Sequence, residues 1–253
     1  MTHFIQTLIS GLSLCSIYAL IALGYTMVYG IAKMLNFAHG DIIMIGAYAG
    51  IVTVNQLGLP PIVAVIVSVV ICAGLGMLIE FLAYKPLRQA PPLSVLITAI
   101  GVSYFLQNSA LLIWKAAARV YPPVVEDSMQ LFGGKLTVSY VSLLTIAACV
   151  VIMIALTLFV NKSKMGKAMR ACSEDKGAAQ LMGINVNSTI SFTFAVGSAL
   201  AGIGSVLYCC SYPQATPTMG SMLGLKAFVA AVLGGIGSIP GAMIGGIAIG
   251  LCE

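Results

Sequence analysis

Charged side chains are scarce in this sequence. Only 8% of the 253 residues are Asp, Glu, Lys or Arg, whereas 60% are hydrophobic. An average soluble domain is about 25% charged and about 45–50% apolar, and a soluble fold of this composition could not cover its surface with polar groups. The composition excludes a disordered chain, a disulfide scaffold and an ordinary cytosolic enzyme. It indicates an integral membrane protein.

Signatures of catalysis and of metal binding are also missing. No G-x-x-x-x-G-K-[ST] phosphate loop occurs, and no paired carboxylates or Ser/His/Asp set stands out. The seven cysteines form no C-x-x-C and lack histidine partners, which favours small core residues over metal ligands. The twelve cations do not cluster as nucleic-acid binders require. We therefore expect no catalytic site, cofactor or metal, and a membrane-embedded enzyme is the least favoured alternative.

Long stretches without a single charge define the fold class. A membrane helix needs roughly 20 mostly apolar residues, and the clear stretches hold six to eight membrane elements, some broken or re-entrant. A β-barrel would alternate in polarity, which the run 62–67 does not. The prediction is an all-α, polytopic domain over residues 1–253. The charge-free stretches are 4–32, 42–79, 89–114, 136–161, 177–225 and 227–252.

Prolines separate these stretches into predicted elements, because proline disfavours a helical residue before it. The chain closes inside an apolar run, from which we expect the native polypeptide to continue past Glu253. The predicted helical elements are 4–31, 42–57, 61–84, 93–114, 138–160 and 188–212, followed by a Gly-rich tail at 220–253.

Five of the twelve cations lie between residues 162 and 176, so the positive-inside rule places the segment 161–187 in the cytoplasm. The turn at 85–88 then lies on the same side, and the loop 115–135 outside. The N-terminus lies outside if 42–57 is a full span, and inside if that helix is re-entrant. Apolar residues recur at helical spacing between Met165 and Met182, with Ser163 as N-cap and Gly183 as end. This pattern predicts an amphipathic helix or helix pair that docks on a partner or on the membrane. A plain cytoplasmic loop is the alternative.

The densest polar group of the N-terminal half falls between two apolar segments. It contains Asn36, His39, Gly40 and Asp41. Ionisable groups at membrane depth are costly and tend to be functional, so we expect a broken helix beside a solute path, with Asn36 and Asp41 capping its ends. An interfacial loop in which His39 and Asp41 meet water is one alternative. A proton relay through the two residues is another.

Small residues spaced four apart also predict close contact between spans. Ala242, Gly246 and Gly250 share one helix face, as do Gly46 and Gly50. Such faces let two backbones approach closely.

Three segments together resemble the permeases of branched-chain amino acid ABC importers. The first runs from Leu35 to Asp41 and continues with Ile45-Gly46-Ala47-Tyr48. The second is Gly166-Lys167-Ala168-Met169-Arg170-Ala171, with Ala178-Ala179 and Met182-Gly183-Ile184 after it. The third is Ala230-Ala231-Val232-Leu233-Gly234-Gly235-Ile236-Gly237-Ser238, followed by Gly241-Ala242 and Gly245-Gly246. The sequence looks most like the first-type permease subunit of that family, whose chains usually continue with another span.

The resemblance implies a multi-pass protein of the bacterial cytoplasmic membrane that imports leucine, isoleucine or valine. It implies a second related permease subunit, two ATP-binding subunits that hydrolyse ATP, and a periplasmic or lipid-anchored substrate-binding protein, with membrane lipids around them. Members of the family can carry other amino acids or amides. The competing reading is an ion-coupled secondary transporter of small solutes, for which Asp41 and Glu80 are the candidate carboxylates.

The predicted site residues fall into two groups. A translocation path or helix break is assigned to Asn36, His39, Gly40, Asp41, Gly234, Gly235 and Gly237. ATPase coupling, within 161–187, is assigned to Gly166, Arg170, Glu174, Asp175 and Gly183.

Overall fold

The computed structural model describes residues 2–121, 128–131 and 136–253. Within these ranges the chain is almost entirely helical. Part of the predicted outer loop 115–135, including Glu126, Asp127 and Lys135, lies outside the described residues.

The elements follow the predicted order. The described residues form ten α-helices and one short π-helix, together with two small antiparallel strand pairs, β1 with β4 and β2 with β3. The elements are α1 (Thr2–Ala32), α2 (His39–Asn55), α3 (Pro61–Ile79), η1 (Glu80–Tyr84), α4 (Pro92–Trp114), β1 (Arg119–Val120), β2 (Ser128–Leu131), β3 (Leu136–Ser139), α5 (Tyr140–Lys162), α6 (Lys164–Glu174), α7 (Lys176–Leu181), α8 (Val186–Ser211), β4 (Gln214–Ala215), α9 (Met219–Leu233) and α10 (Ile239–Cys252).

Five of these helices are long and apolar enough to cross a membrane: α1, α3 with η1, α4, α5 and α8. Two shorter apolar helices, α9 and α10, accompany them. The predicted all-α polytopic fold with broken elements is confirmed. Pro61 and Pro92 stand at the first turn of α3 and α4, where a missing backbone donor does no harm.

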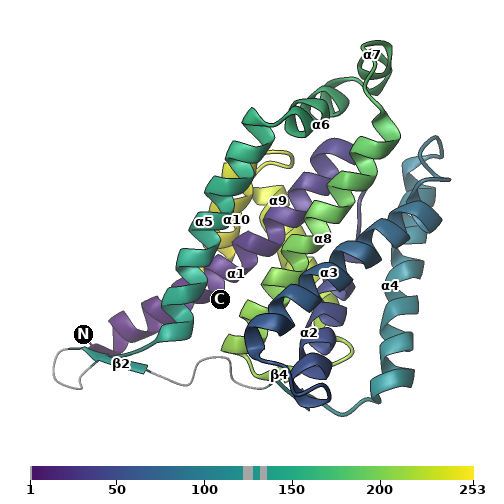
Figure 1. Ribbon diagram of the computed structural model, residues 1–253. Coiled ribbons are helices and arrows are strands. Elements are labelled where there is room, and N and C mark those ends of the chain that lie inside the picture. Colours follow the sequence, from purple (N-terminus) through teal and green to yellow (C-terminus); the bar gives the residue numbers. More distant parts are fainter. Residues whose placement is uncertain (1, 122–127, 132–135) are drawn as a thin grey trace.

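Helix α1 runs through the centre of the molecule and packs against α5, α8, α9 and α10 (Figure 1). Helix α2 lies among α3, α8 and α9. Helix α4 stands at the edge and contacts chiefly α2 and η1, whereas α6 and α7 cap one end of the bundle (Figure 1).

The predicted small-residue contact is present between α1 and α10. A Cβ atom added to Gly246 would lie 2.5 Å from the Cα of Ala19, and one added to Gly250 would lie 2.6 Å from the Sγ of Cys15. Real Cβ atoms do not approach so closely, so glycine is required at both positions. Five of the seven cysteines are buried, as expected of core residues: Cys15, Cys72, Cys149, Cys172 and Cys209.

The course of α2 decides between the two predicted placements of the N-terminus. The N-terminal end of α1 lies far from α6 and α7, and α2 runs away from them toward β4 without returning (Figure 1). The re-entrant alternative for this helix is therefore wrong. The predicted cytoplasmic position of α6 and α7 would then place the N-terminus on the outer side; this orientation stays a prediction.

Candidate functional site

The break between α1 and α2 is built by a non-helical segment, residues 33–38. Helix α1 ends at Ala32, and Lys33 adopts a left-handed conformation with φ 58° while its amide donates to the Tyr29 carbonyl at 2.8 Å. The chain then runs back along the bundle before α2 begins at His39 (Figure 1). Asn36, His39 and Asp41 are all buried, with exposed fractions of 2%, 1% and 0%. The alternative of an interfacial loop in contact with water is therefore wrong.

The predicted capping roles are wrong too. The N-cap of α2 is Ala38, and no side chain caps this helix start. Asn36 instead accepts a hydrogen bond of 2.9 Å from the Tyr84 hydroxyl through its Oδ1. Asp41 lies inside the first turn, where a negative charge favours the helix dipole. Both side chains therefore bind neighbouring elements.

Asp41 is held by α4. Its Oδ2 accepts a hydrogen bond of 2.5 Å from Ser103 Oγ, and its Oδ1 accepts one of 3.0 Å from Gln107 Nε2. His39 points elsewhere and packs edge-on against Tyr25 of α1, with ring centroids 5.9 Å apart. His39 and Asp41 thus face different helices, so the two side chains do not form a direct relay.

Gly40 brings the starts of α2 and α9 together. A Cβ on Gly220 would lie 2.7 Å from the Gly40 carbonyl carbon, and one on Gly224 would lie 3.0 Å from the Gly40 Cα. Neither α2 nor α9 has a side chain that caps its N-terminus among the described residues, whereas α5, α6, α7, α8 and α10 each have one. Two helix starts without side-chain caps therefore meet in the interior.

The glycines of the C-terminal segment build the turn between α9 and α10. Gly234 ends α9, and Gly235 and Gly237 have φ values of +83° and +96°, which side chains rarely adopt. A Cβ on Gly30 of α1 would lie 2.9 Å from the Gly237 Cα. The turn thus touches α1 near the end that precedes the break. The assignment of these glycines to the translocation path stays a prediction.

The predicted coupling segment forms a pair of helices. Ser163 caps α6 by accepting from the Gly166 amide at 2.8 Å, and Asp175 caps α7 by accepting from the amides of Gly177 and Ala178 at 2.7 and 3.1 Å. Gly183, with φ +81°, ends the segment. A Cβ on Gly166 would lie 2.5 Å from the Phe159 carbonyl oxygen, so glycine permits the sharp turn from α5.

The outer surface of this pair carries a shallow apolar groove of about 530 Å³ with charged edges. Leu181 and Met182 are 90% and 83% exposed. Arg170 is exposed and donates 3.2 Å to the Asn161 carbonyl, where it satisfies the end of α5. Among the lining residues are Lys164, Lys167, Ala171, Glu174, Asp175, Ala178 and Met182.

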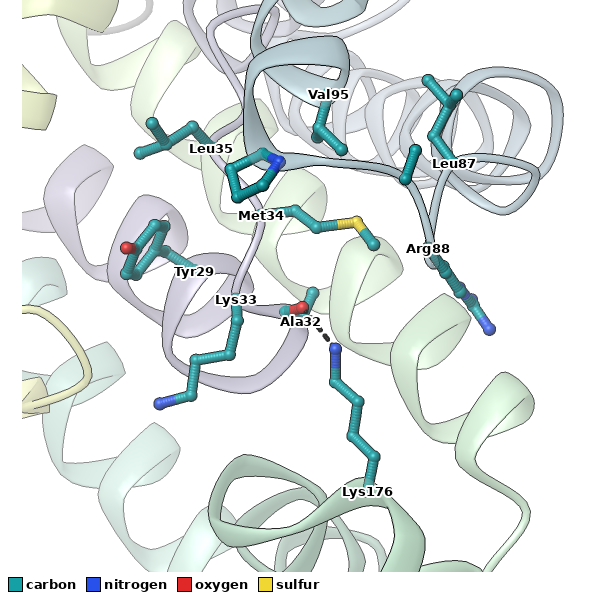
Figure 2. Close-up of a pocket in the computed structure, with 11 residues that line it drawn as sticks. Tyr29, Ala32, Lys33, Met34, Leu35, Leu87, Arg88, Val95 and Lys176 are labelled. Atoms are coloured by element: carbon teal, nitrogen blue, oxygen red, sulfur yellow. Dashed lines mark hydrogen bonds between the residues drawn. The ribbon is translucent and has the colours of Figure 1, made fainter.

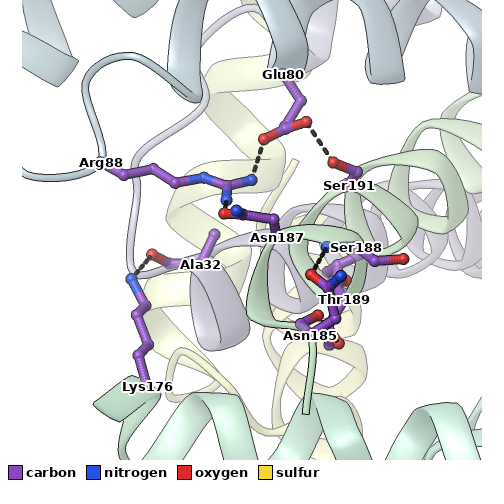
Figure 3. A network of polar contacts seen from close by, with 10 residues as sticks. Ala32, Glu80, Arg88, Lys176, Asn185, Asn187, Ser188, Thr189 and Ser191 are labelled. Carbon is purple, nitrogen blue, oxygen red and sulfur yellow. Dashed lines mark hydrogen bonds and ion pairs between the residues drawn. The ribbon is translucent and has the colours of Figure 1, made fainter. Parts of the chain in front are cut away.

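A polar network links this end of the molecule to the break, and Glu80, a candidate carboxylate from the sequence, is part of it. Lys176 of α7 donates 2.8 Å to the carbonyl of Ala32, the last residue of α1 (Figure 2). Glu80 pairs with Arg88 and accepts 2.6 Å from Ser191, while Arg88 also bonds Asn187 (Figure 3). The sequence signal was available, since Glu80 is the carboxylate in an otherwise apolar span and Arg88 follows eight residues later.

Glu80 is the first residue of the π-helical turn η1. The Lys85 amide donates to the Glu80 carbonyl five residues earlier, at 2.8 Å. Such turns are rare in proteins overall, and those that occur are often found at functional sites. This one aims Glu80 at α8 and Tyr84 at Asn36 in the break.

Comparison with known proteins covers nearly the whole chain. The profile of the family described as "Branched-chain amino acid transport system / permease component" matches residues 7–253. The high-affinity branched-chain amino acid transport system permease protein BraD of Pseudomonas aeruginosa is 42% identical over 99% of this chain and 85% of its own length. The corresponding protein LivH of Escherichia coli is 42% identical with the same coverage. A probable LivH of Methanocaldococcus jannaschii is 30% identical over 94% of this chain and 76% of its own length. No solved structure matches.

Proposed function

The chain belongs to the permease components of branched-chain amino acid transport systems, and we propose that it forms part of the path by which an ATP-driven importer carries leucine, isoleucine or valine across the cytoplasmic membrane. The observation that carries the proposal is the identity of 42–43% with permeases of that named function over 99% of the chain. The five long apolar spans agree with a multi-pass protein of that membrane.

The path is assigned to the interior meeting point of α2 and α9. The positive end of the helix dipole at a broken helix start favours an anionic group such as a substrate carboxylate. Small residues at Gly40, Gly220 and Gly224 keep the two backbones in contact, and the Asp41 carboxylate anchors α2 to the peripheral helix α4. Movement of α4 would therefore be transmitted through Asp41 to the start of α2, where it meets α9.

The driving force is assigned to two separate ATP-binding subunits, because the sequence has no phosphate loop of its own. Their docking surface is the groove on α6 and α7. Exposed Met182 in the groove and Leu181 next to it in sequence supply apolar contact, and Lys164, Lys167 and Glu174 supply charged edges. A second related permease and a periplasmic or lipid-anchored binding protein complete the proposed assembly.

The ion-coupled alternative needs an intramembrane carboxylate that is free to bind a proton or a sodium ion. Both candidates are already engaged: Asp41 accepts from Ser103 and Gln107, and Glu80 pairs with Arg88. Family membership and these contacts together favour the ATP-driven importer.

Reconstitution tests the proposal. The purified permease pair is placed in vesicles with its ATP-binding subunits inside and the substrate-binding protein outside, and uptake of labelled leucine is measured. Uptake should require ATP and should be lost when the ATP-binding subunits carry a substitution that abolishes hydrolysis. Leucine uptake by this chain alone under an ion gradient would instead establish the ion-coupled alternative, and uptake of ribose in preference to leucine would refute the substrate assignment.

A further inference from the structure

A pocket of about 300 Å³ lies where the end of α1, the turn before α4 and the start of α7 meet (Figure 2). Three cations line it: Lys33, Arg88 and Lys176. They come from three separate segments of the chain. The rest of the wall is largely apolar and includes Met34, Leu87 and Val95.

The positive charge in this pocket is only partly neutralised by the described residues. Arg88 is paired with Glu80, and its Nε is buried without a hydrogen-bond partner among the described residues. Lys176 donates one hydrogen bond to the Ala32 carbonyl and has no carboxylate partner among the described residues. Asp175, beside it in sequence, is turned toward its own helix as the α7 cap.

Lys176 is partly buried, whereas Lys33 is exposed. Burial lowers the pKa of Lys176, and the Arg88 guanidinium and Lys33 lower it further. Lys33 occupies the left-handed position at which a helix end usually has glycine. Three cations line this pocket, and Glu80 is the one carboxylate paired with them among the described residues, so an anion would supply the missing counter-charge.

We propose that this pocket binds a phosphate group at the cytoplasmic surface of the membrane. Three cations suit a phosphate better than a single carboxylate, and Arg and Lys are the usual phosphate partners. Basic pockets between membrane helices on this side bind anionic lipid headgroups, and the apolar wall that continues along Leu87 and Val95 suits the first carbons of a lipid. An anionic phospholipid and free inorganic phosphate share this chemistry.

The site adds a link that the transport proposal does not contain. Lys176 belongs to the coupling segment, and Lys33 opens the break that precedes α2. A phosphate bound by both lysines would connect the coupling segment to the break before α2. Because binding is measured without transport, loss of this site and failure of the importer assignment give different results.

Native mass spectrometry of the complete detergent-purified transporter complex tests the proposal, with equal amounts of phosphatidylglycerol and phosphatidylcholine added. The complex should retain phosphatidylglycerol in preference. Removing each lysine should weaken retention about fivefold, and Lys33→Gln with Lys176→Gln about 25-fold. The matched control is Lys85→Gln, because Lys85 lies at the same end of the molecule over the Phe81 ring, outside the pocket. Equal retention of both lipids, or equal loss in the control, would overturn the lipid site.

Two further measurements distinguish free phosphate from a lipid headgroup and control for misfolding of the variants. Inorganic phosphate is compared with chloride at matched ionic strength in lipid-depleted complex. A rise in the unfolding temperature that is absent in the double variant, without a lipid preference, would identify free phosphate as the ligand. Lys33→Gly removes the ammonium while relieving the left-handed backbone, so it should fold at least as well as the wild type yet bind more weakly. A response to neither ligand, or full binding by a folded Lys33→Gly, would refute the proposal.

Discussion

Gln107 of α4 donates a hydrogen bond of 3.0 Å to the carboxylate of Asp41, which lies 66 residues earlier at the start of α2. Ser103, one helical turn before Gln107, donates to the other carboxylate oxygen. Helix α4 packs against little else in the chain apart from η1. This polar contact is therefore a principal attachment of α4 to the body of the molecule.

Asp41→Asn should weaken that attachment. An amide offers one acceptor oxygen where the carboxylate offers two, and neither bond would retain a charged acceptor. Hydrogen bonds to charged groups contribute about 1.5–3 kcal/mol, so we expect leucine uptake in the reconstituted system to fall roughly tenfold while the complex still assembles. Normal uptake with the variant incorporated at wild-type levels would remove Asp41 from the path.

Gly40→Ala tests the contact between α2 and α9. The added methyl group would overlap the Gly220 carbonyl, and forced overpacking costs about 1–3 kcal/mol or more. The control is Gly101→Ala in α4, where an added Cβ meets nothing within 4 Å. Thermal unfolding in detergent should show a lowered midpoint for Gly40→Ala alone. Equal midpoints for the two variants would mean that the starts of α2 and α9 do not touch.

Much of the fold could be predicted, because lipid leaves so few choices to the backbone. The charge-free stretches and the prolines placed the helices to within a few residues, and Ser163 and Gly183 marked the coupling segment because local capping chemistry acts at short range. The small-residue face on α10 was visible as well, since Gly246 and Gly250 are four residues apart.

The partners of Asn36 and Asp41 could not be predicted. Asn36 and Asp41 were expected to cap helix ends because that is their usual local behaviour, yet Tyr84 and Gln107 reach them from distant spans. Which side chain fills such a bond depends on how the helices are arranged in space. The π-helical turn at Glu80 was likewise invisible, because nothing in its apolar sequence separates it from an α-helix.

The pair of Glu80 and Arg88 should be more important for stability than for specificity of uptake. Arg88→Leu would leave the Glu80 carboxylate buried and unpaired, which costs about 3–5 kcal/mol, whereas removing both charges is often neutral. Thermal unfolding should therefore show a large loss for Arg88→Leu and recovery in the double variant with Glu80→Gln. Additive losses in the double variant would show that the two side chains do not interact.

The exposed apolar residues of the coupling segment offer a test of docking that leaves the fold intact. Leu181→Ser with Met182→Ser should change the unfolding temperature little, because both side chains are almost fully exposed. The control is Leu57→Ser. Leu57 is 63% exposed and follows the C-terminal end of α2, away from the coupling segment. Co-purification of the ATP-binding subunits should fall in the first variant and persist in the control. Undiminished co-purification would move the docking surface elsewhere.

Arg170 separates a structural role from an electrostatic one in the same segment. Its guanidinium satisfies the Asn161 carbonyl at the end of α5, so Arg170→Gln and Arg170→Glu both remove that bond, a loss of about 0.5–1.5 kcal/mol for an ordinary hydrogen bond and more for a charged donor. Only Arg170→Glu reverses the charge offered to a partner. The measurement is the ATP hydrolysis that the substrate-loaded binding protein stimulates. If the ATP-binding subunits dock here, this activity should be much lower in Arg170→Glu than in Arg170→Gln. Equal activities would assign Arg170 to the fold of the α5–α6 corner, and wild-type activity in both variants would exclude it from coupling.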